Sequence, residues 1–142
     1  MNNLKAFFAE NVKEEETTKV AVSNRFKDEN GKIIPWEIKA VTSQRDEELR
    51  EKSTKRVDVE GNPGVKVPEL DVNTYIGLLI SECVVFPDLH NAELQNSYKV
   101  MDASSLAKIM LKGGEYQELS KQIQKVNGFN IKFEDEVDEA KN

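Results

Sequence analysis

The chain has 142 residues, enough for one domain, and 32% of them are charged against 38% that are apolar. We therefore expect a modest core beneath a heavily solvated surface. The formal net charge of −6 argues against nucleic acid as the main partner, because binding to phosphates depends on an excess of basic residues.

No apolar run approaches the roughly 18 residues that a membrane span needs, and residues 76–86, the best candidate, are interrupted by Ser81 and Glu82. The apolar patch at 6–9 is too short and too close to acidic residues for a secretory signal. The single cysteine, Cys83, allows no intrachain disulfide, in keeping with a reducing compartment. The sequence thus indicates a cytoplasmic protein without a membrane partner.

The chain begins with a candidate arm. Residues 4–12 place Leu4 and Phe8, with Phe7 beside them, toward one side of a short helix, and an acidic run follows at 14–16. We expect residues 1–16 to form an N-terminal arm, either docked or mobile.

A β-hairpin is predicted next. Residues 18–26 and 33–41 have the β-branched content and rough alternation of half-buried strands. Between them, Asn30-Gly31 signals a tight primed turn. Pro35 lacks an amide donor, so we expect it at a sheet edge or at an unpaired position.

The following segment combines a helix with a second pair of strands. Ser43, followed by several acidic residues, is typical of a capped helix start, and the helix should run to about Lys52. Residues 54–59 and 65–67 flank Gly61-Asn62-Pro63-Gly64. This pattern predicts either a short hairpin or a mobile loop.

From Asp71, the expected N-cap, the pattern changes to helix, and Pro87 should end the first one. Its apolar stripe consists of Val72, Tyr75, Ile76, Leu79 and Cys83. A shorter helix should follow, from a cap at Asn91 to Tyr98.

A third helix is expected to start near Asp102 or Ser104 and to meet a break at Gly113-Gly114. It should resume from Glu115 and end at Gly128. The apolar residues expected along these two stretches are Leu106, Ile109, Met110, Tyr116, Leu119, Ile123 and Val126.

The predicted fold class is therefore α+β, in which an N-terminal β-rich half, made of hairpins and a short helix, packs with a C-terminal group of three to four helices. We expect one domain over residues 1–128. Residues 129–142 hold five acids and few side chains that could form a core, which predicts a disordered acidic tail.

Catalytic chemistry is not indicated. His90, the only histidine, lies in a predicted loop without a nucleophile or metal partner, and Cys83 lies on an apolar stripe, where thiols are inert. The runs of acids at 14–16 and 46–48 are typical of solvated faces. The glycine-rich stretches lack a following Lys-Ser or Lys-Thr, so they indicate turns and not phosphate sites. We expect no enzymatic activity, no metal and no cofactor.

A basic patch is the remaining electrostatic candidate. Lys55-Arg56 lies near Arg45 and Arg50, but acids are interspersed among these residues. The patch is too small to favour RNA binding.

Several stretches, in their order and spacing, carry a family resemblance. They are Leu4-Lys5-Ala6-Phe7-Phe8, Pro35-Trp36-Glu37-Ile38, Thr54-Lys55-Arg56, Asn73-Thr74-Tyr75, Val85-Phe86-Pro87-Asp88-Leu89, Ala92-Glu93-Leu94-Gln95-Asn96-Ser97-Tyr98, Gly114-Glu115-Tyr116 and Val126-Asn127-Gly128-Phe129. Over nearly its whole length the chain resembles the XkdN-like bacteriophage tail assembly chaperones.

The resemblance implies a phage or prophage protein that acts in the bacterial cytoplasm. Such a chaperone would transiently coat the tape measure protein, keep its apolar helices soluble, leave as tail tube subunits polymerise, and be absent from the mature virion. Self-association would suit a coating protein. A structural minor tail or tube-associated virion protein is the alternative, because it would share the size, the acidity and the lack of an active site.

Candidate partner-binding residues are the apolar side chains of the arm and of the third helix, namely Leu4, Phe7, Phe8, Leu106, Ile109 and Met110. An amphipathic helix laid in an apolar groove is an established mode of recognition. The alternative for all six is that they belong to the core, as apolar stripes usually do.

Overall fold

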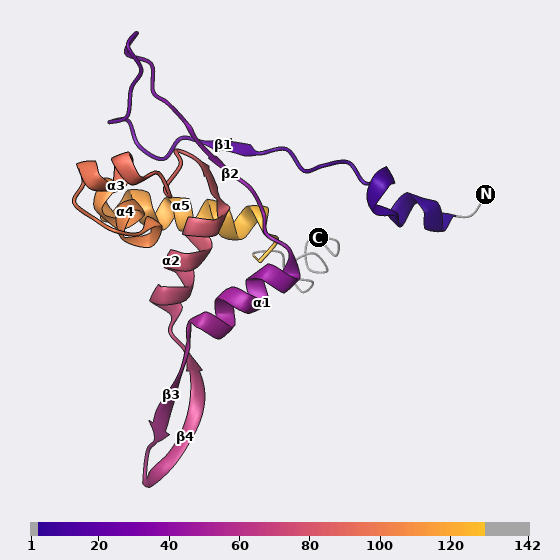
Figure 1. Ribbon diagram of the computed structural model, residues 1–142, viewed down its shortest axis with the longest axis vertical. Helices are drawn as coiled ribbons and strands as arrows, with labels where there is room; N and C mark the ends of the chain where they lie inside the picture. The colour runs from indigo at the N-terminus through magenta and orange to yellow at the C-terminus, as the bar shows by residue number, and fades with distance from the viewer. Residues whose placement is uncertain (1–2, 130–142) are drawn as a thin grey trace, which may run out of the picture.

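The computed structural model describes residues 3–129 and has helices packed against a small antiparallel sheet (Figure 1). The sheet has the strand order β1-β2-β5. Its strands are β1 (Thr18–Val20), β2 (Trp36–Ile38) and β5 (Val84–Phe86). Trp36 and Ile38 of the central strand are buried whereas Glu37 between them is not, so one face of the sheet supplies the core.

Two 3-10 turns and five α-helices complete the described chain, together with a separate hairpin. The 3-10 turns are η1 (Asn3–Phe7) and η2 (Ala9–Asn11), and the hairpin strands are β3 (Thr54–Val59) and β4 (Asn62–Leu70). The helices are α1 (Ser43–Lys52), α2 (Val72–Cys83), α3 (Ala92–Ser97), α4 (Ala103–Met110) and α5 (Gly113–Val126). This arrangement confirms the predicted α+β class.

Helix α2 is at the centre of the packing, since it contacts α1, α4, α5 and β5. Its buried positions are Tyr75, Gly77, Leu79, Ile80 and Cys83. The predicted stripe was wrong at Val72, which is 59% exposed because it lies in the first turn, where α2 leaves the hairpin. The largest fully buried side chains of the core are Trp36, Ile38, Leu79, Ile80, Leu89, Leu106, Leu119 and Ile123.

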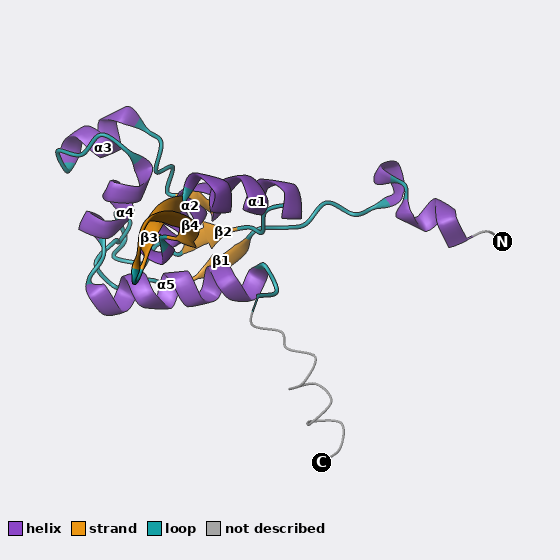
Figure 2. Cartoon of the chain, turned by 90° about the horizontal axis from the view of Figure 1, so that it is seen from below, coloured by secondary structure: helices purple, strands orange, loops and turns teal. Residues whose placement is uncertain are grey.

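Two segments project from this body, the N-terminal arm and the β3–β4 hairpin, and the arm is seen to project in both Figures 1 and 2. The N-terminal arm, η1 and η2, stands away on an extended connection. The β3–β4 hairpin extends beyond the ends of α1 and α2 (Figure 1). The sequence predicted either a short hairpin or a mobile loop for residues 54–67, and the structure shows the hairpin.

The first hairpin is shorter than predicted. Strand β1 stops at Val20, and only an isolated bridge between Lys27 and Ile33 continues the pairing. Val22 and Ser23 are buried, and the Arg25 guanidinium donates to the carbonyl oxygen of Met110 (2.8 Å). The chain leaves the sheet here because it packs against the junction of α4 and α5.

The turn of this hairpin also differs from the prediction. Both primed two-residue turns need positive φ at the first central residue, which would be Asn30, yet Gly31 has positive φ (+80°) and Asn30 does not. The Asp28 carboxylate instead accepts from the amides of Asn30 (2.8 Å) and Lys32 (2.9 Å). An Asx-type turn therefore replaces the primed one. Pro35 precedes β2, outside the paired residues, as expected.

Strand β5 was missed in the sequence. Helix α2 ends at Cys83, before Pro87, because Val84 and its neighbours add a third strand along β2. The pairing is antiparallel, with Ile38 opposite Val84. A short apolar run is compatible with either a helix or a strand. Here it becomes a strand because it can pair with the edge of β2.

The helix ends follow capping chemistry with two corrections. Asp71, Asn91 and Asp102 are N-caps as expected. The cap of α1 is Thr42 and not Ser43, since the Thr42 hydroxyl accepts from the Arg45 amide (3.1 Å).

Helix α5 begins at Gly113 rather than at Glu115, because the Glu115 carboxylate reaches back to accept from the Lys112 amide (2.8 Å). At its other end Gly128 has φ +79°. The Gly128 amide donates to Lys125 O and the Phe129 amide to Gln124 O, which together form a Schellman motif. The predicted acidic tail lies outside the described residues, apart from Phe129.

Candidate partner-binding surfaces

The N-terminal arm exposes large apolar side chains. Leu4, Phe7 and Phe8 are 56%, 77% and 46% exposed, and no residue of η1 or η2 is buried. Asn11 Nδ2 donates to Lys5 O (2.8 Å), which holds the two turns together locally. Three of the predicted partner-binding residues thus lie on a segment that contributes nothing to the core.

The three candidates on α4 are divided between the core and the surface. Leu106 and Met110 are 0% and 5% exposed, because their spacing of four residues places them, with Ala103 and Ala107, on the buried face of the helix. Ile109 lies off that face and is 54% exposed. The core alternative fits Leu106, and Ile109 is the α4 side chain that solvent reaches most freely of the three. Helix α4 and the arm lie at opposite ends of the molecule (Figures 1 and 2).

Met110 also lines an apolar pocket of about 210 Å³ that the sequence did not reveal. The pocket is lined by Phe26, Ile34, Trp36, Phe86, Pro87, Leu94, Tyr98 and Met110. Its residues come from five separate segments, so no local pattern could have indicated it. Small-molecule sites commonly occupy roughly 300–1,000 Å³, and this almost wholly apolar pocket is smaller, with room for about one apolar side chain.

The hairpin carries a further apolar surface that the sequence analysis did not single out. Val57 and Val67 are directly opposed across β3 and β4, and Val65 lies two residues from Val67 along β4. Val65 and Val67 are both exposed. The alternation of valines with Lys66 and Asp58 was the signal available in the sequence.

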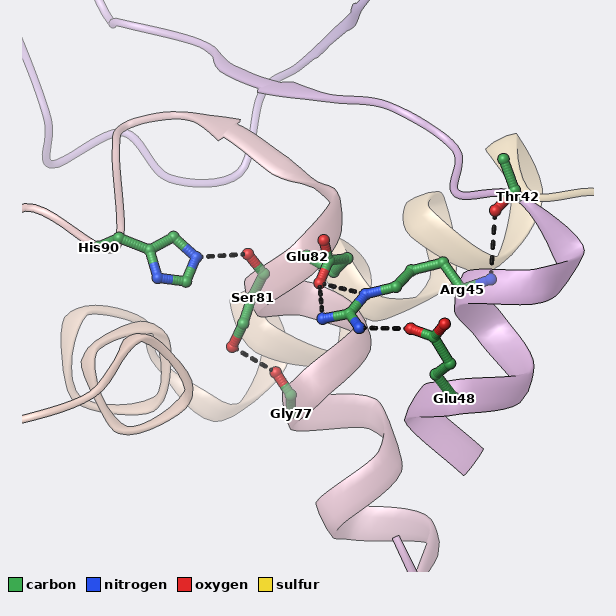
Figure 3. Close-up of polar contacts among 7 residues, drawn as sticks. All are labelled: Thr42, Arg45, Glu48, Gly77, Ser81, Glu82 and His90. Atoms are coloured by element: carbon green, nitrogen blue, oxygen red, sulfur yellow. Dashed lines mark hydrogen bonds and ion pairs between the residues drawn. The ribbon is translucent and has the colours of Figure 1, made fainter. Parts of the chain in front are cut away.

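Polar contacts beside these surfaces serve the fold. Figure 3 shows Arg45 of α1 between Glu48 of its own helix and Glu82 of α2, with nitrogen–oxygen distances of 2.7 Å to each. These hydrogen bonds, foremost that with Glu82, raise the pKa of Arg45 above its usual value. Figure 3 also shows His90 Nε2 lying 3.2 Å from Ser81 O, while the Ser81 hydroxyl donates to Gly77 O.

The anticipated basic patch is largely neutralised. Arg45 pairs as described, Arg50 pairs with Asp46 (2.9 Å), and Lys55 lies 3.8 Å from Asp71. The expectation of a hydrated acidic face was wrong for Asp46, whose side chain is mostly buried between Arg50 and Tyr75. Ion pairs within α1, between α1 and α2, and between β3 and the cap of α2 explain the mixed charges.

The remaining reactive groups are placed as structural ones. Cys83 is fully buried, and burial raises the pKa of its thiol to about 11, so it remains protonated at neutral pH. Within residues 3–129 no group of three or more histidine, cysteine or acidic side chains is arranged to hold a metal ion. Over the same residues, each helix is too short or too polar to traverse a bilayer.

Exposed aromatic side chains on a projecting arm, an apolar pocket and a projecting hairpin are the candidate partner-binding surfaces of this small domain. The model of the phage XkdN-like tail assembly chaperone family matches residues 4–141. The chain belongs to this family of phage tail assembly chaperones.

Two relatives from Bacillus subtilis strain 168 are each 35% identical over 130 residues. They are the phage-like element PBSX protein XkdN and the uncharacterized protein YqbN, and each alignment covers 91% of this chain and 86% of the relative. The crystal structure of YqbN superposes with a TM-score of 0.78 at 29% identity, covering 92% of this chain and 99% of that one. The fold described above is therefore shared along almost the whole chain.

Proposed function

We propose that this protein transiently binds the tape measure protein of its phage or prophage in the host cytoplasm. Binding keeps the tape measure protein soluble until tail tube subunits displace the chaperone, which is then absent from the finished virion. The protein performs this role without catalysis, cofactor or nucleic acid. The observation that carries the proposal is the arm, which presents Phe7 and Phe8 to solvent and buries none of its own residues.

Exposed aromatic side chains grouped on one segment favour a binding role. Aromatic rings supply large apolar contact areas with few rotatable bonds, and clustered exposed apolar groups mark interaction sites. An elongated, apolar client helix would cover Phe7 and Phe8 along one of its faces. The net charge of −6 would help the coated client to stay in solution.

The pocket beside Trp36 offers a second point of contact, because its lining includes Leu94 of α3 and Met110 of α4. Both helices lie on the opposite side of the molecule from the arm (Figure 1). It is apolar and accommodates one side chain, as expected for a groove that accepts an anchor residue of an amphipathic helix. Contacts at both ends would let one chaperone cover an extended stretch of client. Ile109 on α4 is the remaining exposed candidate for such contact.

The test is coexpression with the tape measure protein encoded in the same genomic neighbourhood, followed by a pull-down and a solubility assay. We expect the two proteins to form a soluble complex when they are coexpressed. The tape measure protein should be insoluble when it is expressed alone. Phe7→Ser with Phe8→Ser should reduce recovery of the complex on the order of tenfold or more, by analogy with aromatic anchors at interfaces. Met101→Ser removes another highly exposed apolar side chain outside these surfaces and should have no effect.

Leu94→Glu and Ile109→Ser extend the test to the pocket and to α4. If Leu94→Glu reduces recovery of the complex and the arm variant does not, the client binds at the pocket and not at the arm. Failure of the wild-type proteins to form any complex would contradict the proposal. Recovery of this chain from purified tails would then favour a structural tail subunit.

A further inference from the structure

Within residues 3–129, no strand pairs with the outer edge of β3, which lies on a projecting ribbon. The hairpin extends beyond α1 and α2 (Figure 1), and every residue of β3 is exposed or half-buried. Two-stranded ribbons are only marginally stable in water, whereas three or more strands with an apolar face are stable. Additional strands on this ribbon would therefore stabilise it.

The backbone directions along β3 follow from one hydrogen bond at the base of the hairpin. The Asp71 amide donates to Ser53 O (2.8 Å), and this pair continues the register in which Thr54 lies opposite Leu70. Alternate residues of an antiparallel ladder bond to the partner strand. Lys55 and Val57 consequently bond to β4, while the amides and carbonyls of Thr54, Arg56 and Asp58 point outward.

The two outer edges of the ribbon differ. Pro68 lies opposite Arg56, so its nitrogen faces outward on β4, and Pro63 lies on the same strand. Proline removes an amide donor and blunts an edge. Strand β3 contains no proline, so its edge is the better suited of the two to pair with another strand.

The charges on β3 are complementary to those of a second β3 running antiparallel. With Val57 opposite Val57 of the second copy, Arg56 lies opposite Asp58 of the second copy and Asp58 opposite its Arg56. A shift of the two-fold axis to Arg56 or to Asp58 would place like charges directly opposite each other, which is destabilising. A change of one residue in the register between the two β3 strands would place the valines of the two copies on opposite faces of the sheet. It would also misalign the outward amides and carbonyls of the two strands.

Arg56 and Asp58 are available for this pairing. Both side chains are exposed. The Arg56 guanidinium donates to Lys66 O at 3.1 Å, an exposed contact with a neutral acceptor, and a carboxylate is the stronger partner.

We propose that two copies of this chain associate through β3, forming a four-stranded antiparallel sheet in the order β4-β3-β3-β4 about a two-fold axis at Val57. Arg56 and Asp58 form two symmetric ion pairs across the seam. Val57 and Val67 of both copies then line one continuous apolar face. The interface is small, so the association is concentration-dependent. This self-association is separate from client binding and involves no residue of the arm.

The first arm of the test is site-specific cross-linking of the purified full-length chain. Val57→Cys places two thiols at the axis, where non-hydrogen-bonded antiparallel pairs have Cα atoms about 4.5 Å apart, within disulfide range. Mild oxidation should yield a dimer in high proportion. Val67→Cys, opposite Val57 but on the far strand, should not cross-link, and the native Cys83 is buried and unreactive.

The second arm is a charge-exchange experiment followed by sedimentation equilibrium. Arg56→Asp and Asp58→Arg each place like charges across the axis and should weaken self-association on the order of tenfold. An equimolar mixture of the two variants restores opposite charges at both pairs, so association should return to nearly the wild-type level. This recovery separates the interface from any effect of either change on the hairpin itself.

Three outcomes overturn the proposal. The first is a wild-type chain that stays monomeric at hundreds of micromolar, which would leave the edge to an extended segment of another protein. The second is equal cross-linking of Val57→Cys and Val67→Cys. The third is a mixture of Arg56→Asp and Asp58→Arg that associates no better than either variant alone. Because the experiments use this chain alone, failure to bind the tape measure protein would not affect them.

Discussion

The Tyr75 hydroxyl of α2 donates a hydrogen bond to the Asp46 carboxylate of α1, and the Arg50 guanidinium lies over the Tyr75 ring, 4.5 Å from its centroid. Arg50 also pairs with Asp46 (2.9 Å). These three residues join the two helices from which the β3–β4 hairpin projects. This polar network therefore holds the base of the hairpin, and its Tyr75 side chain is buried.

Two tyrosine-to-phenylalanine changes should differ in their effect on stability. Tyr75→Phe removes a satisfied hydrogen bond to a carboxylate and should lower the free energy of unfolding by about 1–3 kcal/mol. Within residues 3–129 the buried Tyr116 hydroxyl has no hydrogen-bond partner, so Tyr116→Phe should leave stability unchanged or raise it. Urea denaturation of both variants at neutral pH measures the difference. Equal destabilisation by the two changes would contradict the unpaired state of the Tyr116 hydroxyl, and no effect of Tyr75→Phe would contradict the hydrogen bond to Asp46.

Tyr75 also predicts a loss of stability at alkaline pH. Burial, and then the hydrogen bond to Asp46, raises its pKa from 10.0 to about 12. The folded state holds the hydroxyl proton of Tyr75 more tightly than the unfolded state does. The contribution of Tyr75 to the free energy of unfolding is therefore complete below pH 10 and is lost as pH rises from 10 toward 12. Thermal midpoints between pH 9 and 12 should fall more steeply for wild type than for Tyr75→Phe. Parallel curves would contradict the prediction.

Two truncations on α2 test which of its faces is buried. Leu79 is fully buried, and Leu79→Ala should cost about 2–5 kcal/mol through lost contacts and a cavity. Val72→Ala on the same helix removes an exposed side chain and should change stability by less than about 0.5 kcal/mol. Chemical denaturation of the pair provides the comparison. A large effect at Val72 would mean that the start of α2 is covered in solution.

Gly77 permits the close approach of α2 to α4. A Cβ atom at this position would lie 2.3 Å from Ser104 Oγ and 3.5 Å from Ser104 Cβ. Gly77→Leu should therefore overpack the contact and cost about 1–3 kcal/mol. Gly77→Ala combined with Ser104→Ala removes the close oxygen and gains about 1 kcal/mol of helix propensity, so the double variant should exceed wild type in thermal midpoint. A double variant less stable than Gly77→Ala alone would refute this packing.

Glu115 predicts sensitivity to acid. Its carboxylate accepts from the Lys112 amide (2.8 Å) and from the Arg25 guanidinium (2.7 Å), and these bonds, the first foremost, lower its pKa from 4.5 to about 2. The stabilisation is complete above pH 4.5 and is lost as pH falls toward 2. Glu115→Gln should flatten the decline in stability over that range.

Glu118→Gln is the matched control for this change, because Glu118 is exposed on the same helix and accepts from Gln122. It should follow the wild-type acid profile. Denaturation midpoints measured from pH 6 to pH 2.5 provide the comparison. A Glu115→Gln profile identical to that of Glu118→Gln would exclude Glu115 as the sensitive group.

Local chemistry was sufficient to predict much of the secondary structure. Asp71, Asn91 and Asp102 cap their helices as expected, because an N-cap depends on a side chain within three residues of the amide that it accepts. The end of α5 at Gly128 was predicted for the same reason. Strand β5 was not, since Val84–Phe86 becomes a strand only where the edge of β2 is available to it.

The candidate surfaces divide in the same way. The exposure of Phe7 and Phe8 agrees with their assignment to a separate arm, which the acidic run after them indicated. The separation of Ile109 from Leu106 and Met110 depends on which face of α4 meets α2 and α5, and apolar character alone does not distinguish the three. The pocket beside Trp36 needed five segments to converge.

The amino-acid sequence by itself determined the α+β class, the N-caps of α2, α3 and α4, and the family, because propensity, capping and motif order can be read along the chain. Only the tertiary structure decided that Met110 lines a pocket and that the Asp46 side chain is mostly buried against Tyr75. It also decided that, within residues 3–129, β3 has no strand on its outer side, where the backbone amides and carbonyls of Arg56 and Asp58 point. These features depend on the register of paired strands and on the faces that helices turn toward one another. Contacts between residues distant in the chain fix both, and no local pattern encodes them.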